Sequence, residues 1–232
     1  ALVTGCSGFT GKYLTKQLQV LGYQVFGTTH HTEDVHERCF YVDLCDAKSL
    51  EDVVNRLQVD IVIHLAAISF VAHGCASDIY NSNIIGTRNL LSALANCDHC
   101  PTSVIIASSA NVYGNSSSGF LTEVSPLAPA NDYAVSKMAM EYMAGLWSEK
   151  LPIVIVRPFN YSGVGQSERF LLPKIVGHFS RREKSMMLGN LDVYRDFSDV
   201  RMVVDAYCKI ITSNTTSGTY NICSGNLHSL SE

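Results

Sequence analysis

Charge is scarce in this chain of 232 residues, in which Asp, Glu, Lys and Arg together make up 16% and the formal net charge is −4. A chain without a basic excess has no general attraction for nucleic acid or for an anionic membrane. No apolar run approaches the roughly 20 residues that a membrane-spanning helix needs. Because 47% of the residues are hydrophobic, the composition instead predicts a globular protein with a substantial core.

The sequence also lacks the pattern of a disulfide scaffold or of a metal centre. Its eight cysteines are spread along the chain, whereas disulfide-stapled secreted domains are shorter and denser in cysteine. Cys97 and Cys100 have the spacing of a zinc-binding pair, but no second pair of ligands accompanies them. We therefore expect reduced thiols, no metal site and a cytoplasmic protein.

Both ends of the sequence look interrupted. Ala1 falls within what the pattern indicates is a strand, and residues 229–232 resemble the start of a helix with Ser229 as its N-cap. We expect that the chain is clipped at both ends, so the lack of a signal peptide carries little weight.

Short β-branched apolar runs alternate with helical patterns over the first two-thirds of the chain, without an internal repeat. This alternation is typical of βαβ units, and continuous apolar strands are typical of a sheet covered on both faces. We expect an α/β fold with a doubly wound parallel sheet, followed by a smaller interleaved region and with a polar surface loop at 116–129. The predicted strands are 1–3, 24–27, 40–42, 61–65, 104–107 and 153–156, and the predicted helices are 11–21, 47–57, 83–95 and 131–149.

Three glycines, Gly5, Gly8 and Gly11, lie between the first predicted strand and the first predicted helix. Glycine permits a tight turn and a close approach of the backbone to a pyrophosphate, and the helix N-terminus offers free N–H groups and a positive dipole end. In this context the loop predicts a dinucleotide site. The alternative is three glycines in an ordinary turn.

The second predicted strand is not followed by the carboxylate that usually binds the ribose 2′-hydroxyl of NAD. Thr28, Thr29 and His30 stand there, and the next carboxylate is Glu33. A 2′-phosphate would not be repelled, so we expect NADP, although NAD stays possible because no arginine stands at this position. Asp43, after the third strand, would face the adenine edge or simply begin a helix.

Tyr133 and Lys137 are four residues apart on a predicted helix and therefore share one face. A nearby cation should lower the pKa of the phenol, which is near 10 when free, and so make it a proton relay between a carbonyl and an alcohol. Ser109 follows a buried strand, at the edge where such sheets bind ligands, and would donate to a substrate oxygen. The alternatives are a solvated helix face and a serine that caps a turn.

Together these motifs resemble the extended short-chain dehydrogenases/reductases that act on nucleotide sugars. The resemblance covers nearly the whole chain and rests on residues 5–11, Asp43, 64–67, 83–87, 108–114, Tyr133, Lys137 and 157–160. It implies a Rossmann-type NAD(P)-binding domain over residues 1–157, and a nucleotide-sugar-binding region, interleaved with the first and truncated, over 158–232.

The resemblance also implies residue roles. Ser109, Tyr133 and Lys137 would form the catalytic triad, Lys137 would hold the nicotinamide ribose, and Asn83 would support the geometry of the catalytic helix. The implied cofactor-binding residues are Gly5, Ser7, Gly8, Phe9, Thr10, Gly11, Thr28, His30, Asp43, Leu44, Leu65, Ala66, Ala67, Asn83, Tyr133, Lys137, Pro158 and Phe159.

Later segments (157–166, 170–175, 189–192 and 195–197) resemble GDP-mannose 4,6-dehydratases and GDP-4-keto-6-deoxymannose reductases. This implies that Ser109 and Asn111 contact the substrate and that Asn160, Lys174 and Arg195 contact its nucleotide diphosphate. Cations and amide donors suit a diphosphate. The alternative for Lys174 and Arg195 is an ordinary solvated surface.

Asn111 separates two reactions of this family. The dehydratases place a carboxylate two residues after the catalytic Ser or Thr, and an asparagine cannot act as that base. We therefore expect NAD(P)H-dependent reduction of the carbon-4 keto group of a nucleotide-linked 4-keto-6-deoxyhexose, with a GDP-sugar favoured. A 4-epimerase or 4,6-dehydratase of the same family is the alternative, and a non-catalytic dinucleotide sensor is another. The family commonly dimerises through helices 83–95 and 131–149, so we expect a homodimer.

Overall fold

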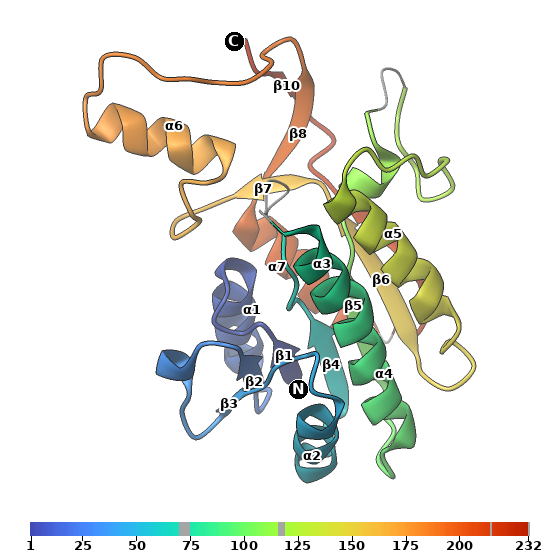
Figure 1. Ribbon diagram of the computed structural model, residues 1–232. Coiled ribbons are helices and arrows are strands. Elements are labelled where there is room, and N and C mark those ends of the chain that lie inside the picture. Colours follow the sequence, from blue (N-terminus) through green and yellow to red (C-terminus); the bar gives the residue numbers. More distant parts are fainter. Residues whose placement is uncertain (70–74, 116–118, 214, 232) are drawn as a thin grey trace.

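The computed structural model describes residues 1–69, 75–115, 119–213 and 215–231, and its largest element there is a seven-stranded sheet (Figure 1). The strand order is β3-β2-β1-β4-β5-β6-β9, and all neighbouring strands are parallel. The predicted doubly wound sheet is therefore confirmed. Its strands are β1 (Leu2–Thr4), β2 (Phe26–Thr29), β3 (Cys39–Tyr41), β4 (Ile61–His64), β5 (Ser103–Ala107), β6 (Ile153–Pro158) and β9 (Gly218–Ile222).

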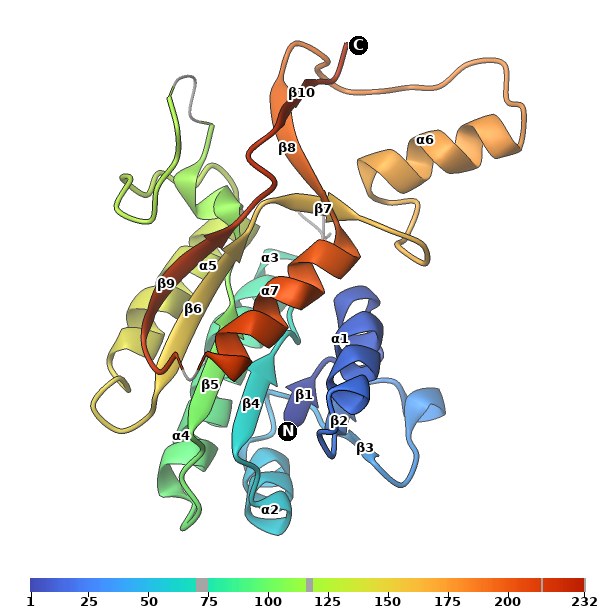
Figure 2. The same ribbon diagram turned by 180° about the vertical axis from the view of Figure 1, so that it is seen from behind.

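Helices cover both faces of this sheet (Figures 1 and 2). One face carries α2 (Ala47–Leu57), α4 (Thr87–Asn96) and α5 (Asp132–Gly145), and the other carries α1 (Phe9–Val20) and α7 (Val200–Thr212). Because side chains alternate along a strand, each strand feeds two cores, and this is why the strands are continuously apolar.

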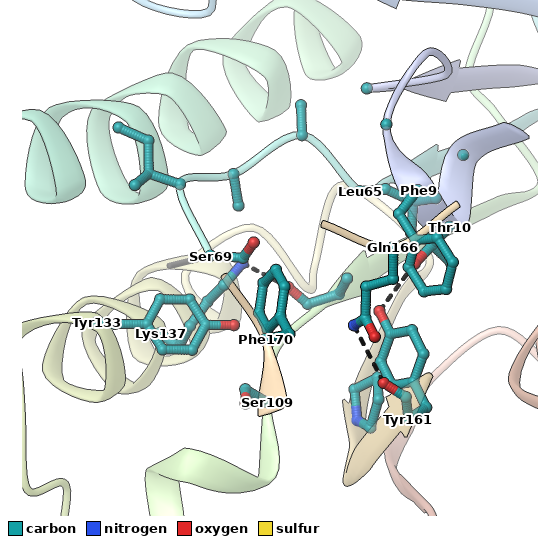
Figure 3. A pocket seen from close by; sticks show the side chains of 18 of the residues that line it. Phe9, Thr10, Leu65, Ser69, Ser109, Tyr133, Lys137, Tyr161, Gln166 and Phe170 are labelled. Atoms are coloured by element: carbon teal, nitrogen blue, oxygen red, sulfur yellow. Dashed lines mark hydrogen bonds between the residues drawn. The ribbon is translucent and has the colours of Figure 1, made fainter. Parts of the chain in front are cut away.

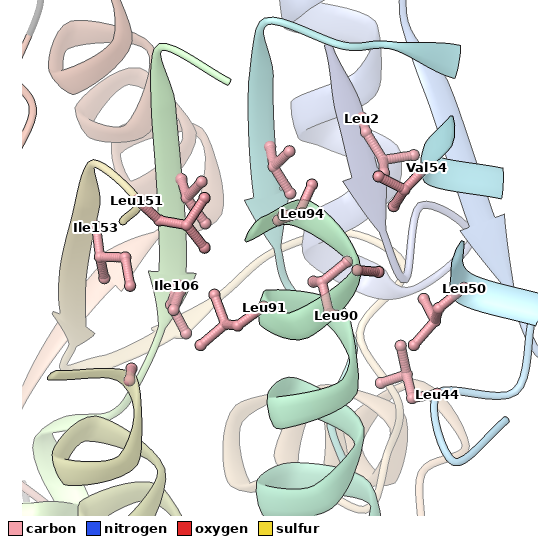
Figure 4. Close-up of a cluster of buried hydrophobic side chains, with 14 of the residues drawn as sticks. Leu2, Leu44, Leu50, Val54, Leu90, Leu91, Leu94, Ile106, Leu151 and Ile153 are labelled. Atoms are coloured by element: carbon pink, nitrogen blue, oxygen red, sulfur yellow. The ribbon is translucent and has the colours of Figure 1, made fainter. Parts of the chain in front are cut away.

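Successive side chains of β5 belong to different cores. Ile106 belongs to the core under α4 and α5, together with Leu90 and Leu91 (Figure 4), whereas Ile105 belongs to the core under α1 and α7. Local caps support the same arrangement, since the Asn131 side chain accepts a hydrogen bond from the Ala134 N–H and so begins α5.

The helix before β5 is longer than the sequence predicts. It begins with α3 (Ala76–Tyr80), continues through a π-helical segment at Asn81–Gly86, and passes directly into α4. The predicted start at residue 83 is therefore wrong. The boundaries of other elements differ by a few residues, since α1 begins at Phe9 and α5 ends at Gly145.

A smaller three-stranded sheet lies beyond the carboxyl ends of the large one (Figure 1). It consists of β7 (Asn160–Ser162), β8 (Tyr194–Asp199) and β10 (Leu227–Ser229), and α6 (Leu171–Ser180) lies beside it. The chain crosses between the two parts, because α7 and β9 follow β8 but belong to the large sheet and its helical layer. The domain boundary at residue 157 stays a prediction.

Two local expectations have different outcomes. Ser229 ends strand β10 and residues 230–231 are not helical, so the helix start predicted there is wrong. The loop predicted at 116–129 contains neither a helix nor a strand over 119–129, and residues 116–118 lie outside the described part.

All eight cysteines are free thiols. The described segments contain no group of three or more His, Cys, Asp or Glu residues that could hold a metal ion. None of their helices has both the length and the apolar character that crossing a membrane would demand.

Candidate active site

A cavity of about 670 Å³ opens at the carboxyl ends of β1 through β6. All parallel strands of the large sheet end at this edge, so the segments that follow six of them reach one place. The strand order reverses between β1 and β4, and the loops after these two strands diverge there to leave a crevice. The cavity is therefore where the topology predicts a ligand site.

The glycine loop after β1 forms one wall of the cavity and fits a dinucleotide. Gly5 has φ +69°, and a Cβ added there would lie 3.0 Å from the Ala66 backbone. A Cβ added at Gly11 would lie 2.2 Å from the Gly5 carbonyl oxygen, so only glycine lets α1 approach the loop so closely. The first turn of α1 has no side-chain cap and no acidic residue, which leaves its N–H groups for a pyrophosphate.

The end of β2 forms the adjoining wall. Thr29 Oγ1 lies 2.8 Å from Ser7 Oγ and accepts a hydrogen bond from the His31 N–H, and His30 and His31 also line the cavity. Asp43 follows the neighbouring strand β3 and also lines the cavity, and its carboxylate accepts a hydrogen bond from the Cys45 N–H. No carboxylate follows β2 directly at the cavity wall.

Tyr133, Lys137 and Ser109 lie together on the opposite side of the cavity (Figure 3). Tyr133 and Lys137 share one face of α5, and Ser109 follows β5. The three residues are 7%, 4% and 8% exposed, so they are nearly enclosed by protein. Lys137 Nζ donates a 2.8 Å hydrogen bond to the Ala107 carbonyl, which ties α5 to the end of β5.

Burial controls the acid–base properties of this pair. Burial raises the pKa of Tyr133 to about 12, although a hydrogen bond with Ser109 opposes the shift. Burial lowers the pKa of Lys137 to about 8, and the Glu141 carboxylate opposes that shift. The expected lowering of the Tyr133 pKa by Lys137 is therefore not what the structure shows, because burial, which disfavours the charged phenolate, is the largest influence on it. Near neutral pH the phenol keeps its proton.

Ser109 is oriented by its own local turn. Its Oγ accepts hydrogen bonds from the backbone N–H and from the side-chain Nδ2 of Asn111, each at 3.2 Å. These contacts use the acceptor capacity of the hydroxyl, so its hydrogen is the part that it can donate, either to Tyr133 or to a ligand in the cavity. Asn111 also lines the cavity, so an amide stands where a dehydratase would need a carboxylate.

Asn83 lies behind the cavity wall rather than on it. It is 1% exposed within the π-helical segment. Its Oδ1 accepts a hydrogen bond from the Ile68 N–H, and its Nδ2 donates one to the Ile68 carbonyl. Its Nδ2 also donates to Ser136 Oγ, and Ser136 donates to the Tyr133 carbonyl. Asn83 thus connects the loop after β4 with the helix that carries Tyr133.

Most of the predicted site residues meet at this cavity, but three do not line it: Asn83, Lys174 and Arg195. Lys174 is exposed and donates to the Met187 carbonyl, and Arg195 is exposed and donates to the Tyr194 carbonyl. Asn160 does line the cavity, where its Nδ2 donates to the Asp196 carbonyl. The structure therefore does not bring the two cations to the site, and their role stays a prediction.

Tyr161 is a site residue that the sequence reasoning missed. Its hydroxyl lies 2.8 Å from Thr10 Oγ1, and its carbonyl accepts a hydrogen bond from Gln166 (Figure 3). Its ring stacks on that of Phe9, with 6.1 Å between the ring centroids. It thereby joins β7 to the start of α1. The sequence signal that could have identified Tyr161 is its position directly after Asn160, which was itself predicted as a site residue. Other lining residues that were not predicted are His31, Val42, Ile68, Ser69, Ser82, Ala107, Ser108, Ser162, Gln166, Phe170, Leu171, Leu172, Phe197 and Tyr207.

The chain belongs to the NAD-dependent epimerase/dehydratase family, whose model matches residues 1–223. The resemblance to extended short-chain dehydrogenases/reductases is thereby confirmed, and the protein is an NAD(P)-dependent enzyme of that type.

Two relatives are similar over almost the whole chain. The GDP-6-deoxy-D-talose 4-dehydrogenase of Aggregatibacter actinomycetemcomitans is 36% identical over 97% of this chain and 74% of that protein. The GDP-6-deoxy-D-mannose reductase of Pseudomonas aeruginosa is 34% identical over 96% of this chain and 74% of that protein.

Two solved structures have the same fold. A protein from Burkholderia cenocepacia J2315, provisionally named an epimerase, is 50% identical with a TM-score of 0.92, over 100% of this chain and 77% of that one. The NADPH complex of RMD from Pseudomonas aeruginosa is 30% identical with a TM-score of 0.83, over 99% of this chain and 77% of that one. These similarities establish an enzyme that modifies nucleotide sugars and leave its particular reaction to be argued.

Proposed function

We propose that the protein uses NADPH to reduce the carbon-4 keto group of a GDP-linked 4-keto-6-deoxyhexose. The observation that carries the proposal is the polar content of the cavity beside Ser109. Tyr133 offers a protonated phenol there, and the sole carboxylate among the described lining residues is Asp43, at the far, adenine end. Such a site can add a proton to an oxygen at carbon 4, but the described residues that line it include no base placed to remove a proton from carbon 5.

The chain's own residues divide the work of the reduction. Tyr133 would donate its proton to the oxygen at carbon 4, Ser109 would donate a hydrogen bond to the same oxygen, and the charge of Lys137 would stabilise the phenolate that remains. A phenol with a pKa of about 12 stays protonated until a strongly basic alkoxide develops, so it is suited to act as the acid. A bound nicotinamide dinucleotide would supply the reducing equivalent.

The choice of NADPH is supported by the end of β2. A carboxylate at this position would repel a 2′-phosphate, and Thr29, His30 and His31 stand there instead, as hydrogen-bonding groups. One structural relative is an NADPH complex. NAD is the second candidate, since no arginine lines this part of the cavity among the described residues.

The choice of a GDP-sugar is supported by the two relatives whose names specify GDP-linked 6-deoxyhexoses. Asn160 supplies an amide at the cavity wall for the substrate. Lys174 and Arg195 lie on α6 and β8, and we propose them as further contacts of the diphosphate.

A panel of substrates tests the proposal. GDP-, dTDP- and CDP-linked 4-keto-6-deoxyhexoses are each mixed with the protein and NADPH or NADH, and the nicotinamide absorbance is followed. We expect one equivalent of NADPH to be oxidised per GDP-sugar, with slower reaction of the other nucleotides. If none of these sugars oxidises either cofactor, the proposal is wrong.

A carbon-4 epimerase is the second candidate, because the 50% identical structure is provisionally named an epimerase. It would use the same triad but would oxidise and re-reduce one substrate. The same assay separates the two, since an epimerase converts its sugar without net consumption of added NADPH.

We further propose a cytoplasmic homodimer. Eight free thiols support a reducing compartment. The paired helices α4 and α5 support dimerisation, since Tyr142 and Leu146 at the end of α5 are 69% and 83% exposed.

A further inference from the structure

A buried ion pair lies next to the proposed catalytic residues and has no part in the chemistry above. Glu141 on α5 and Arg157 on β6 form two parallel hydrogen bonds, Nη2 to Oε2 at 2.6 Å and Nε to Oε1 at 2.9 Å. Their side chains are 7% and 6% exposed. Burying two charges costs several kcal/mol of solvation, and apolar residues of similar volume often stabilise a fold as well or better. Stability alone therefore does not explain the pair.

The pair connects three segments that carry site residues. Glu141 Oε1 also accepts a hydrogen bond from Ser108, the neighbour of Ser109 at the end of β5. Arg157 Nη1 donates to the Tyr113 hydroxyl at 2.8 Å, at the end of the turn that Ser109 caps. Arg157 itself precedes Pro158, which lines the cavity. A displacement of Glu141 would consequently move Ser109.

Glu141 also acts on Lys137, because the two residues are one helical turn apart on the same face of α5. Two other titratable groups lie near Lys137. Tyr133 on α5 is a neutral phenol, and His64 on β4 is kept neutral because burial lowers its pKa to about 3. Arg157 on β6 is already paired with Glu141. Glu141 is therefore the carboxylate that favours the charged ammonium, against the burial that disfavours it.

We propose that Glu141 is a positioning residue whose carboxylate, anchored by Arg157, keeps Lys137 in its charged form and Ser109 directed into the cavity. The proposal rests on the proposed function for the roles of these two residues. It assigns a reason to the buried pair, since only an anchored carboxylate can do both.

The test is Glu141→Gln, which keeps the shape of the side chain and removes its charge. We expect Lys137 to lose its proton at a pH lower by about one unit, because it loses the opposite charge beside it. The readout is the ¹³Cε NMR titration of Lys137 in labelled protein, assigned by its absence from Lys137→Arg. We also expect kcat at pH 8 to fall about tenfold with KM less affected, and the alkaline limb of kcat to move to lower pH by the same amount as the NMR midpoint.

Removing one partner of a buried pair can unfold a protein, so a second variant accompanies the first. Glu141→Gln with Arg157→Gln leaves no unpaired buried charge, and the midpoint of Lys137 should fall again but by less, because a positive charge is removed together with the carboxylate. The matched control is Asp205→Asn, which removes a carboxylate four residues from Lys209 on the surface of α7. It should leave the midpoint of Lys137 and the pH profile unchanged.

The outcomes separate this inference from the proposed function. A Lys137 midpoint that falls in neither variant, or an equal loss of kcat at every pH, would show that Glu141 is merely structural and overturn the inference. Failure of the proposed function would instead appear as no turnover of any sugar by the unmodified protein. The NMR titration needs no substrate and so remains decisive in that case.

Discussion

At the scale of single residues, the site is defined by two ionisable groups whose pKa values burial moves in opposite senses. Tyr133 is held as a phenol with a pKa of about 12, and Lys137 is brought to about 8. A phenol of this kind is a proton donor at neutral pH and a poor base. A protonated phenol favours reduction of a ketone over oxidation of an alcohol, provided that Lys137 is charged when the proton leaves Tyr133.

Removal of the phenol hydroxyl should separate chemistry from binding. Tyr133→Phe keeps the ring but loses the proton donor, so we expect kcat to fall at least about a hundredfold. Binding of NADPH, followed by fluorescence titration, should change little, because the glycine loop lies on the opposite wall. Turnover at the unmodified rate would show that another group is the acid.

The pH dependence of the reaction should follow Lys137. Its ammonium is charged below a pH of about 8 and neutral above it, so the stabilisation of the Tyr133 phenolate is lost as the pH rises through that value. We expect kcat for reduction to decline above a pH of about 8 when measured with saturating substrates. A rate that holds constant up to pH 10 would contradict this role of Lys137.

At the scale of elements, the helix before β5 carries an irregularity with a structural purpose. The π-helical segment Asn81–Gly86 contains Asn83, which is bonded to both the loop after β4 and helix α5. Such segments often occur at functional sites because they turn one residue out of the regular pattern. Here that residue joins two walls of the cavity.

Loss of this connection should weaken both the fold and the activity. Asn83→Ala leaves the Ile68 backbone and Ser136 without their buried partner, so we expect the free energy of unfolding to fall by about 2–3 kcal/mol. Thermal denaturation should show a Tm lower by roughly 5–10 °C. A variant with unchanged Tm and kcat would show that the loop and α5 are positioned without Asn83.

The regular elements could be predicted because their pattern is local. The runs around Ile63, Ile105 and Val154 are continuously apolar since each strand serves two cores, and that pattern identified β4, β5 and β6. The start of the helix at Ala76 was missed because Ile79 is the buried residue of α3, so this first part of the helix carries no apolar stripe. The extra residue of the π-helical segment also shifts the helical period.

The site was predictable to the extent that its residues follow strands. Residues after the ends of parallel strands share one edge, so Gly5, Ala66, Ser109 and Pro158 meet there as expected. The link between Tyr161 and Thr10 and the pair of Glu141 and Arg157 join residues that no local pattern relates. Such contacts depend on tertiary packing and become visible only in the structure.

At the scale of the whole molecule, two layers of helices enclose the large sheet and the small sheet lies beyond its carboxyl edge (Figures 1 and 2). The cavity lies between the glycine loop of the large sheet and β7 of the small one, and Tyr161 and Gln166 join them. A dinucleotide on one wall and a sugar against the other would therefore meet beside Tyr133.

The outer face of α5 should determine the oligomeric state. Tyr142 and Leu146 are exposed apolar residues at the end of this helix, and a second copy would cover them. We expect Leu146→Glu to convert a dimer into a monomer in sedimentation velocity experiments without loss of the fold. If the unmodified protein is already a monomer at micromolar concentration, the proposed dimer is wrong.

The central claim is that the protein reduces the carbon-4 ketone of a nucleotide sugar and that Tyr133 supplies the proton. Its most direct measurement is the reaction of a GDP-linked 4-keto-6-deoxyhexose with NADPH that carries deuterium at both positions of carbon 4 of the nicotinamide. The account predicts one NADPH oxidised per sugar and one deuterium at carbon 4 of the hexose, both abolished in Tyr133→Phe. A product without deuterium at that carbon, or conversion of the sugar without consumption of NADPH, would contradict it.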